Sequence, residues 1–222
     1  SYTPDWRAPG PEQDLSDQAA LLRTLLVLGK EHAAHQILET MASGFFDDDM
    51  GVFYGRRVWQ DQGEWFVDPA IYTARNAAAI RACVAAFNQL GDENAMQMAR
   101  RAMNYLLLHH ETGDKKFYHH SNVDEGADLV VLADQPKVGL ALFDLSEVDS
   151  TVPWRDRAWG IAEQLKGELE LTTTATTTTA ELLWRLGEHQ AAVTLLEQNA
   201  DEQPSLDVCA RHGIALVTMG KF

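Results

Sequence analysis

The chain is short of basic residues. It has 222 residues, with 18 Lys and Arg against 33 Asp and Glu, so its net charge is −15 at pH 7. Proteins that bind nucleic acid or an anionic membrane surface need a basic face. No apolar run approaches the roughly 20 residues of a membrane-spanning helix. We therefore expect no nucleic-acid partner and no membrane insertion.

Cysteine is scarce as well. Cys83 and Cys209 are far apart, and each lies inside an apolar helical pattern. A disulfide framework or a zinc site would need more thiols at closer spacing, and no C-x-x-C redox motif is present. We predict buried, reduced thiols, no metal, no cofactor and a cytoplasmic location. No signal peptide is visible, although a chain that opens with Ser1 leaves an already removed signal as the alternative.

Familiar catalytic motifs are also missing. The sequence contains no glycine-rich phosphate loop, no G-x-S-x-G elbow and no H-E-x-x-H. A pair of carboxylates for glycoside hydrolysis could be drawn from the 33 acids, but their separation decides that chemistry. No catalytic residue is assigned, and the sequence leans away from an enzyme.

What the chain does have is helical periodicity. Leu15, Ala19, Leu22 and Leu26 start a 3.6-residue apolar period that recurs almost to the end of the chain. About nine helices with short turns predict an all-α fold of stacked antiparallel hairpins. Residues 1–14, with three prolines, predict an extended arm, and residues 15–222 a single helical domain.

Three segments qualify this pattern. Asp/Gly clusters beside aromatic pairs at 45–55 and 109–120 predict short β-hairpins or loops at one end of the array. The threonine-rich segment 171–180 has poor helix propensity, yet its position in the array predicts a helix.

The sequence also repeats itself. An Asp-Gln pair occurs at 17–18 and again at 134–135, each followed by an apolar helix. Gly91 and Gly187 align at the turn between two helices. We predict two copies of a two-hairpin unit, since a single hairpin cannot bury its apolar face.

The strings LSDQAALLRTLL, FFDDDMGVFYG, DPAIYTARNAAAI and QLGDENAMQMARRAMNYL together resemble one family. It is the helical C-terminal portion of thioredoxin-domain proteins of the spermatogenesis-associated, YyaL-like type. The resemblance implies an (α/α) toroid similar to N-acylglucosamine 2-epimerases and six-hairpin glycosidases. The thioredoxin part itself is missing, and about four hairpins make only a partial toroid.

Three functions are open, two from the resemblance and one from the C-terminal sequence itself. The leading hypothesis is a non-catalytic binding or assembly module derived from such a toroid. The first alternative is a carbohydrate-active toroid, an epimerase or glycosidase relative. The second is a tetratricopeptide-like interaction module at the C-terminal edge, residues 185–222. Open ends of an incomplete toroid favour a protein partner or a homo-oligomer, with a saccharide as the other candidate ligand.

The resemblance also implies that loops at one end of the inner helices line a funnel with carboxylates and aromatics. The candidate ligand-binding residues on this basis are Asp17, Trp65, Asp68, Tyr72, Arg75, Asn76 and Asp134, with Gln18 and Gln135 beside them. A purely structural alternative is that Asp68 caps a helix beginning at Pro69, and that Asp17 and Asp134 cap their own helices.

Two further clusters suggest metal sites, but each has a simpler interpretation. The acidic string 46–51 lacks the ligand spacing of a calcium loop, so we predict a solvated turn. The histidine pairs 109–110 and 119–120 flank a polar turn and are predicted to form a surface cluster.

Overall fold

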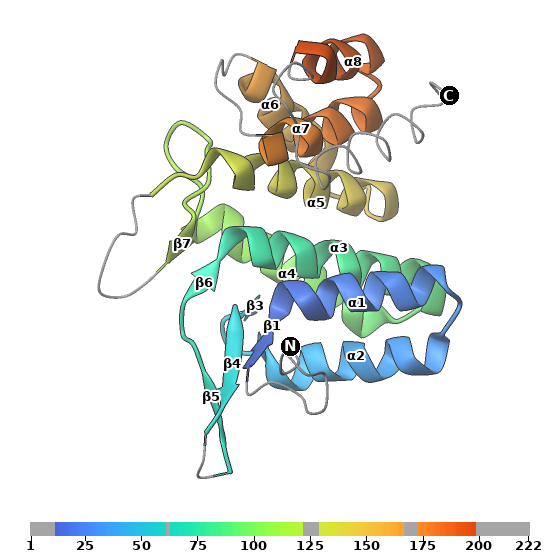
Figure 1. The fold of residues 1–222 in the computed structure, drawn as a ribbon, viewed down its shortest axis with the longest axis vertical. Helices are drawn as coiled ribbons and strands as arrows, with labels where there is room; N and C mark the ends of the chain where they lie inside the picture. Colours follow the sequence, from blue (N-terminus) through green and yellow to red (C-terminus); the bar gives the residue numbers. More distant parts are fainter. Residues whose placement is uncertain (1–11, 61–62, 122–128, 167–172, 199–222) are drawn as a thin grey trace. The chain divides into compact units, whose positions relative to one another are not determined.

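A computed structural model describes residues 12–60, 63–121, 129–166 and 173–198 (Figure 1). The chain forms two compact units, Ser1–Val130 and Val131–Phe222, and each is treated by itself below. Folding of residues 15–222 as one domain stays a prediction. The described residues contain eight α-helices and few, short strands, so the all-α prediction is confirmed. The ninth expected helix lies beyond residue 198, outside the described residues.

Unit 1 contains two helical hairpins. Its helices are α1 (Leu15–Val27), α2 (Glu31–Gly44), α3 (Thr73–Leu90) and α4 (Glu93–His109). Helix α1 packs against α2 and α3, and α3 packs against α4. The predicted stripe of α1 is confirmed, since Leu15, Ala19, Leu22 and Leu26 are all buried. Figure 1 shows α1 and α3 running side by side in the same direction.

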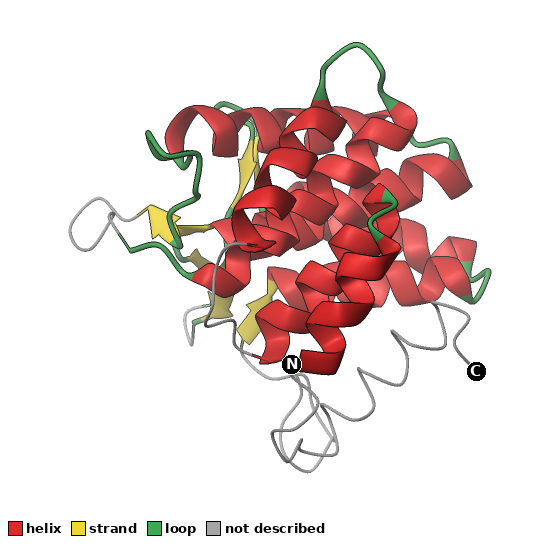
Figure 2. Ribbon diagram, turned by 90° about the horizontal axis from the view of Figure 1, so that it is seen from above, coloured by secondary structure: helices red, strands yellow, loops and turns green. Residues whose placement is uncertain are grey.

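All the strands among the described residues belong to unit 1, and Figure 2 shows them gathered towards one end of its helices. In a three-stranded sheet, β4 (Arg56–Trp59) lies between β1 (Glu12–Asp14) and β5 (Trp65–Val67). Two small ladders join β2 (Phe46–Asp47) to β3 (Val52–Phe53), and β6 (Ile71–Tyr72) to β7 (His120–Ser121).

The strands test two predictions. The hairpin predicted at 45–55 is confirmed by β2 and β3, and the one at 109–120 by a bridge between Glu111 and Phe117. The last three residues of the predicted extended arm form β1, which pairs with β4, and residues 1–11 lie outside the description.

Unit 2 contains two more hairpins behind a short 3-10 turn, η1 (Leu132–Asp134). Its helices are α5 (Gln135–Val148), α6 (Trp154–Lys166), α7 (Thr173–Leu186) and α8 (His189–Gln198). Helix α5 packs against α6 and α7, and α7 packs against α8. A Cβ at Gly139 would lie 2.5 Å from Leu182 Cδ2, so this glycine lets α5 and α7 approach closely.

The threonine-rich segment is helical, as predicted, from Thr173 onward. Thr176 and Thr179 are fully buried three residues apart. Packing of this face overrides the poor intrinsic propensity of β-branched residues. The tetratricopeptide-like edge at 185–222 is described only as far as residue 198, and it stays a prediction.

The prediction of a sequence repeat is confirmed at Gly91 and Gly187 and is wrong at the two Asp-Gln pairs. Gly91 follows α3 with φ 69° and Gly187 follows α7 with φ 97°, so both supply the left-handed residue of a hairpin turn. The two Asp-Gln pairs are not equivalent helix starts, because Asp17 lies inside α1 and Asp134 precedes α5. The acid that matches Asp134 in position is Asp14, immediately before α1.

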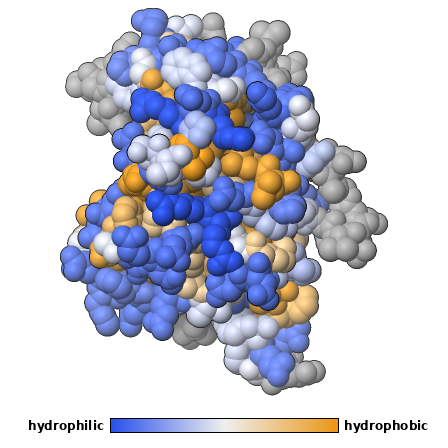
Figure 3. Space-filling view, turned by 180° about the vertical axis from the view of Figure 1, so that it is seen from behind, coloured by the Kyte–Doolittle hydropathy of each residue, from blue (hydrophilic) through white to orange (hydrophobic). Residues whose placement is uncertain are grey.

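The described helices include none that is both long and apolar enough to cross a bilayer. Hydrophilic side chains predominate on the face in Figure 3, consistent with the net charge of −15.

Candidate functional site

Helices α1 and α3 of unit 1 begin at the same end, where strands β1, β6 and β7 meet them (Figure 1). The backbone fixes this arrangement. The amide of Leu15 donates to the carbonyl of Gly55 at 3.0 Å, and that of Thr73 to the carbonyl of His119 at 3.0 Å. Both helix N-termini are therefore tied to the loops around them.

A group of charged and aromatic side chains lies at this end, and we name it the Arg75 cluster: Asp14, Tyr72, Arg75, His119 and His120. Arg75 Nη2 lies 2.9 Å from Asp14 Oδ2. The Arg75 guanidinium carbon lies 4.3 Å from the centroid of the Tyr72 ring, within cation–π range. The Arg75 and Asp14 side chains are 27% and 24% exposed, so solvent and solutes can reach both.

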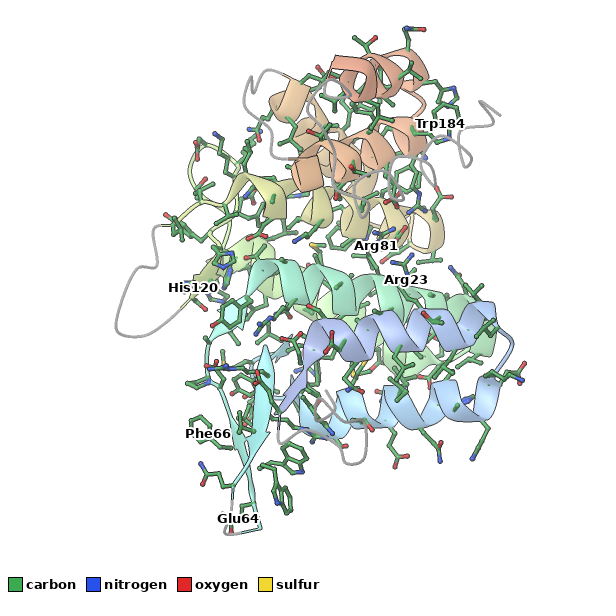
Figure 4. The ribbon with its side chains drawn as sticks, viewed as in Figure 1. Arg23, Glu64, Phe66, Arg81, His120 and Trp184 are labelled. Atoms are coloured by element: carbon green, nitrogen blue, oxygen red, sulfur yellow. The ribbon has the colours of Figure 1, made fainter. Side chains whose placement is uncertain are left out.

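The two histidines complete the aromatic side of the cluster. The Tyr72 ring centroid lies 5.9 Å from that of His119 and 5.7 Å from that of His120, in edge-on geometry. The strand pair β6–β7 sets this contact, because Tyr72 stands opposite His120. The Nδ1 atom of His120 is buried without a hydrogen-bond partner, and so is Nη1 of Arg75. Figure 4 labels His120 at this end of the unit.

A glycine makes the close packing of the cluster possible. A Cβ at Gly55 would lie 2.5 Å from Tyr72 Cδ2 and 2.8 Å from Arg75 Nη1. Any larger residue would have to push the tyrosine and the guanidinium away from the backbone.

Below the cluster, His110 forms a buried network. Its Nδ1 lies 2.8 Å from Thr73 Oγ1, and its Nε2 lies 3.1 Å from Ser121 Oγ. Because the Thr73 hydroxyl donates to the carbonyl of Tyr118, it accepts from Nδ1–H, which assigns the tautomer. Burial, with a smaller effect from His109, lowers the pKa of His110 to about 4. A neutral imidazole thus fixes β7 to the first residue of α3.

Asn76 is a structural residue. It is fully buried, its Oδ1 accepts from the Phe53 amide at 3.0 Å, and its Nδ2 donates to the Phe53 carbonyl at 2.9 Å. Nδ2 also donates to the Tyr72 carbonyl at 3.1 Å. The amide is committed to joining β3 to α3, so its predicted place among the ligand-binding residues is not supported by its surroundings.

Asp68 does not cap a helix. Helix α3 begins at Thr73, and its N-cap, Tyr72, makes no side-chain cap bond, so the prediction of a helix start at Pro69 is wrong. Strand β6 intervenes between Pro69 and the helix. Asp68 Oδ1 instead accepts from the Ala70 amide at 3.0 Å, and Oδ2 accepts from Arg56 Nε at 2.9 Å.

Trp65 lies on the β4–β5 hairpin. Its ring meets Trp59 at 5.2 Å, and the Arg57 guanidinium lies 4.5 Å from its centroid. Trp65 contacts Arg57, whereas Asp68 contacts Arg56. Arg56 and Arg57 are successive residues of β4, and side chains alternate between the two faces of a strand. The structure therefore separates two residues that the sequence analysis grouped in one pocket.

Neither Asp17 nor Asp134 caps its helix through its side chain. Asp14 caps α1 by accepting from the Ser16 amide at 2.7 Å, and Asp17 is exposed in the first turn. Asp134 is buried in unit 2, 3.6 Å from Lys137 Nζ, and η1 takes the place of a capped helix start. Of the predicted site residues, the structure thus brings Tyr72 and Arg75 into the cluster, with Asn76 one turn away.

The acidic turn 46–51 is held by its own hydrogen bonds. Asp47 Oδ1 accepts from the amides of Met50 at 2.8 Å and Asp49 at 2.9 Å, and Oδ2 accepts from the Tyr54 hydroxyl at 2.6 Å. These bonds lower the pKa of the Asp47 carboxyl and raise the pKa of Tyr54 to about 12. Across the part of the chain that is described, His, Cys, Asp and Glu form no group of three that could hold a metal ion.

The predicted surface cluster of histidines is wrong in one respect. His109 is exposed, but His110 is fully buried and His119 and His120 are partly buried against Tyr72. Pairing of β6 with β7 brings these histidines towards the interior. A strand of two residues is too short to show an alternating sequence pattern, so the sequence does not reveal this pairing.

A shallow pocket of about 270 Å³ lies elsewhere, between α2 and the start of α4. Its lining includes His35, Glu39 and Asp92, and Asp92 already caps α4 through its bond from the Ala95 amide. It contains none of the predicted site residues, and we place the candidate site at the Arg75 cluster.

Sequence reasoning missed Asp14, His119 and His120. Asp14 directly precedes the apolar helical period, as N-caps do, and that signal was available. The histidines could not be placed because long-range strand pairing brings them to Tyr72.

No protein-family model matches the chain, and no curated protein matches it. Solved structures do. A D-mannose isomerase has a TM-score of 0.68 at 11% identity, over 87% of this chain and 59% of its own. The cellobiose 2-epimerase of Spirochaeta thermophila has a TM-score of 0.66 at 12% identity, over 96% and 61%.

A family 76 glycoside hydrolase (mannosidase) of Bacteroides thetaiotaomicron has a TM-score of 0.66 at 13% identity, over 84% of this chain and 58% of its own. The chain thus spans about three fifths of the length of these structures. At such identities the similarity establishes the fold alone. The chain has an all-α fold of the (α/α)-toroid type, similar to that of N-acylglucosamine 2-epimerases and six-hairpin glycosidases.

Proposed function

We propose that the chain is part of a carbohydrate-active (α/α) toroid and binds a sugar at the Arg75 cluster. The observation that carries the proposal is the combination of an aromatic ring, a guanidinium and a carboxylate within direct contact at the N-termini of α1 and α3. A sugar offers apolar ring faces and hydroxyl groups. Tyr72 can stack against such a face, and Arg75 and Asp14 can donate to and accept from hydroxyls.

The similar structures support the sugar as the ligand. Their names describe an isomerase of mannose, an epimerase of cellobiose and a mannosidase. Two imidazoles beside the tyrosine are suited to moving protons, so isomerisation or epimerisation is the reaction that fits best. His119 and His120 would be its acid and base.

A non-catalytic module is the second candidate, and one observation favours it. Arg75 and Asp14 neutralise each other, which suits binding more than proton transfer. This hypothesis includes descent from the thioredoxin-domain proteins and a cytoplasmic location. The buried free thiol of Cys83 agrees with that location.

Thermal unfolding with a panel of mannose, glucose, N-acetylglucosamine, cellobiose and mannobiose tests the binding. A sugar present at about 100 times its dissociation constant stabilises the folded state by about 2.7 kcal/mol, or roughly 5–10 °C. Arg75→Ala should abolish this shift. Its own stability cost should stay below about 1 kcal/mol, because the ion pair is partly exposed.

Arg101 offers a matched control. It pairs with Asp48 at 3.2 Å and lies 5.3 Å from the Phe46 ring, so it has the same kinds of contact outside the cluster. Arg101→Ala should keep the sugar-induced shift. No shift with any sugar, or equal loss in both variants, would refute the proposed site. If the shift is present, NMR of the mixture separates the candidates: new epimers indicate an enzyme, and an unchanged sugar indicates a binding module.

A further inference from the structure

One face of the sheet β1–β4–β5 continues the surface of the Arg75 cluster. Asp14 of the cluster stands opposite Arg56 in the β1–β4 pairing, so the two side chains lie on the same face of the sheet. Arg56 pairs with two further acids of this face, Glu12 at 3.4 Å and Asp68 at 2.9 Å. Side chains that can exchange hydrogen bonds with a ligand therefore extend from the cluster across the sheet.

An exposed aromatic ring lies on the same face. Phe66 stands opposite Val58 in the β4–β5 pairing, and it lies two residues from Asp68. Side chains two residues apart on a strand project to the same face. Phe66 is 52% exposed, and Figure 4 shows it on the side of the hairpin away from α2. We name this surface the Phe66 face: Glu12, Arg56, Val58, Phe66 and Asp68.

The distance between Phe66 and the cluster exceeds the size of one sugar ring. Two strand spacings and a step of two residues separate Asp14 from Phe66, which is about 12 Å at about 4.8 Å per strand and about 3.4 Å per residue. A single pyranose cannot contact both ends of this path, whereas a short oligosaccharide can. Arg56 lies between the two ends, because β4 is the central strand.

On the basis of the sugar site proposed above, we infer that the Phe66 face is an extension of that site and that the ligand is a neutral oligosaccharide of about three units. One unit occupies the Arg75 cluster, and the chain continues over Arg56. Hydroxyls of the next unit exchange hydrogen bonds with Arg56 and Asp68. The Phe66 ring then packs against the apolar face of the distant unit.

The charges of this surface determine the class of sugar. The Phe66 face together with Asp14 and Arg75 carries three carboxylates and two guanidinium groups, which gives it a net negative charge. Both guanidinium groups already lie beside carboxylates of the protein. An acidic sugar would bring a further negative charge to this surface, and like charges across an interface oppose binding. The inference is therefore restricted to neutral chains.

Calorimetric titration of the full chain tests the inference, with mannose, mannobiose and mannotriose as one series and glucose, cellobiose and cellotriose as the other. In the series that binds, affinity should rise about 10-fold from the monosaccharide to the trisaccharide, since an added aromatic contact supplies a gain of this order. Trigalacturonic acid, as the acidic probe, should bind at least about 10-fold more weakly than the neutral trisaccharide.

Two substitutions at Phe66 test its part. Phe66→Ala should remove the gain, so that the trisaccharide binds no more tightly than the monosaccharide. Phe66→Tyr keeps the ring and should keep the gain. The matched control is Trp59, which is 46% exposed and pairs with Trp65 on the opposite face of the same hairpin. Trp59→Ala should keep the gain.

The outcomes separate this inference from the proposed function. Absence of binding by every sugar refutes both. Equal affinity for mono- and trisaccharide in the parent overturns the inference and leaves the sugar site at the Arg75 cluster. A gain that survives Phe66→Ala, or that Trp59→Ala removes equally, also overturns it. If the parent is dimeric in sedimentation velocity and Phe66→Ala is monomeric, the face is a contact between two copies, and the inference is wrong.

Discussion

Replacing Asn76 with alanine should destabilise unit 1 strongly and leave sugar binding, per folded molecule, largely intact. The amide of Asn76 satisfies both the N–H and the C=O of Phe53, at 3.0 and 2.9 Å, inside the protein. Alanine leaves these two buried backbone groups without a partner, at about 1–3 kcal/mol each. The third bond, to the Tyr72 carbonyl at 3.1 Å, is lost as well. We expect a loss of about 3 kcal/mol or more in the free energy of unfolding.

Urea unfolding followed by tryptophan fluorescence and circular dichroism measures this loss. Asn104→Ala is the control, because Asn104 is exposed in the middle of α4, where alanine should change stability by less than about 1 kcal/mol. A loss below about 1 kcal/mol in Asn76→Ala would show that the amide does not join β3 to α3 as described. A normal melt combined with abolished sugar binding would make Asn76 a ligand-binding residue after all.

Three other outcomes follow from the same end of the molecule and its core. The pKa of His110 is lowered to about 4 by burial, so the unfolded chain takes up a proton first, and stability should fall by about 3 kcal/mol between about pH 6.5 and 4. His110→Gln should flatten that acid limb in urea titrations at a series of pH values. Gly55→Ala should abolish the sugar-induced thermal shift, because its Cβ would displace Tyr72 and Arg75; an unchanged shift would place the ligand elsewhere. Burial raises the pKa of the Cys83 thiol to about 12, so peptide mapping after iodoacetamide treatment at pH 8 should find it alkylated only in denatured protein.

The helices could be predicted because their signals are local. The apolar period of α1 and the left-handed glycines after α3 and α7 are features of contiguous sequence. The threonine-rich helix α7 was predicted from its place in the array, against its propensity, and burial of Thr176 and Thr179 shows why that prediction is correct.

The candidate site was predictable only in part. Tyr72 and Arg75 were identified because they lie three residues apart in one segment of the sequence, at the start of an apolar helical pattern. The Asp-Pro pair at 68–69 misled the prediction, because the two-residue strand β6 delays the helix to Thr73. Asp14, His119 and His120 reach the cluster through tertiary contacts that leave no periodic signal.

The burial of these residues separates two roles that the sequence cannot distinguish. Asn76, Thr73 and His110 are fully buried, and their described hydrogen bonds go to other parts of the protein. Arg75 and Asp14 form an ion pair at a partly exposed surface, where solvent screening keeps the pair weak. Asp14 also caps α1 through the Ser16 amide, and the Arg75 guanidinium also lies against the Tyr72 ring. A ligand hydroxyl can therefore replace part of that ion pair at little cost to folding. Substitution of Asn76, Thr73 or His110 should therefore lower stability, whereas substitution of Arg75 should lower sugar binding with little effect on stability. Substitution of Asp14 should lower both, because Asp14 also caps α1.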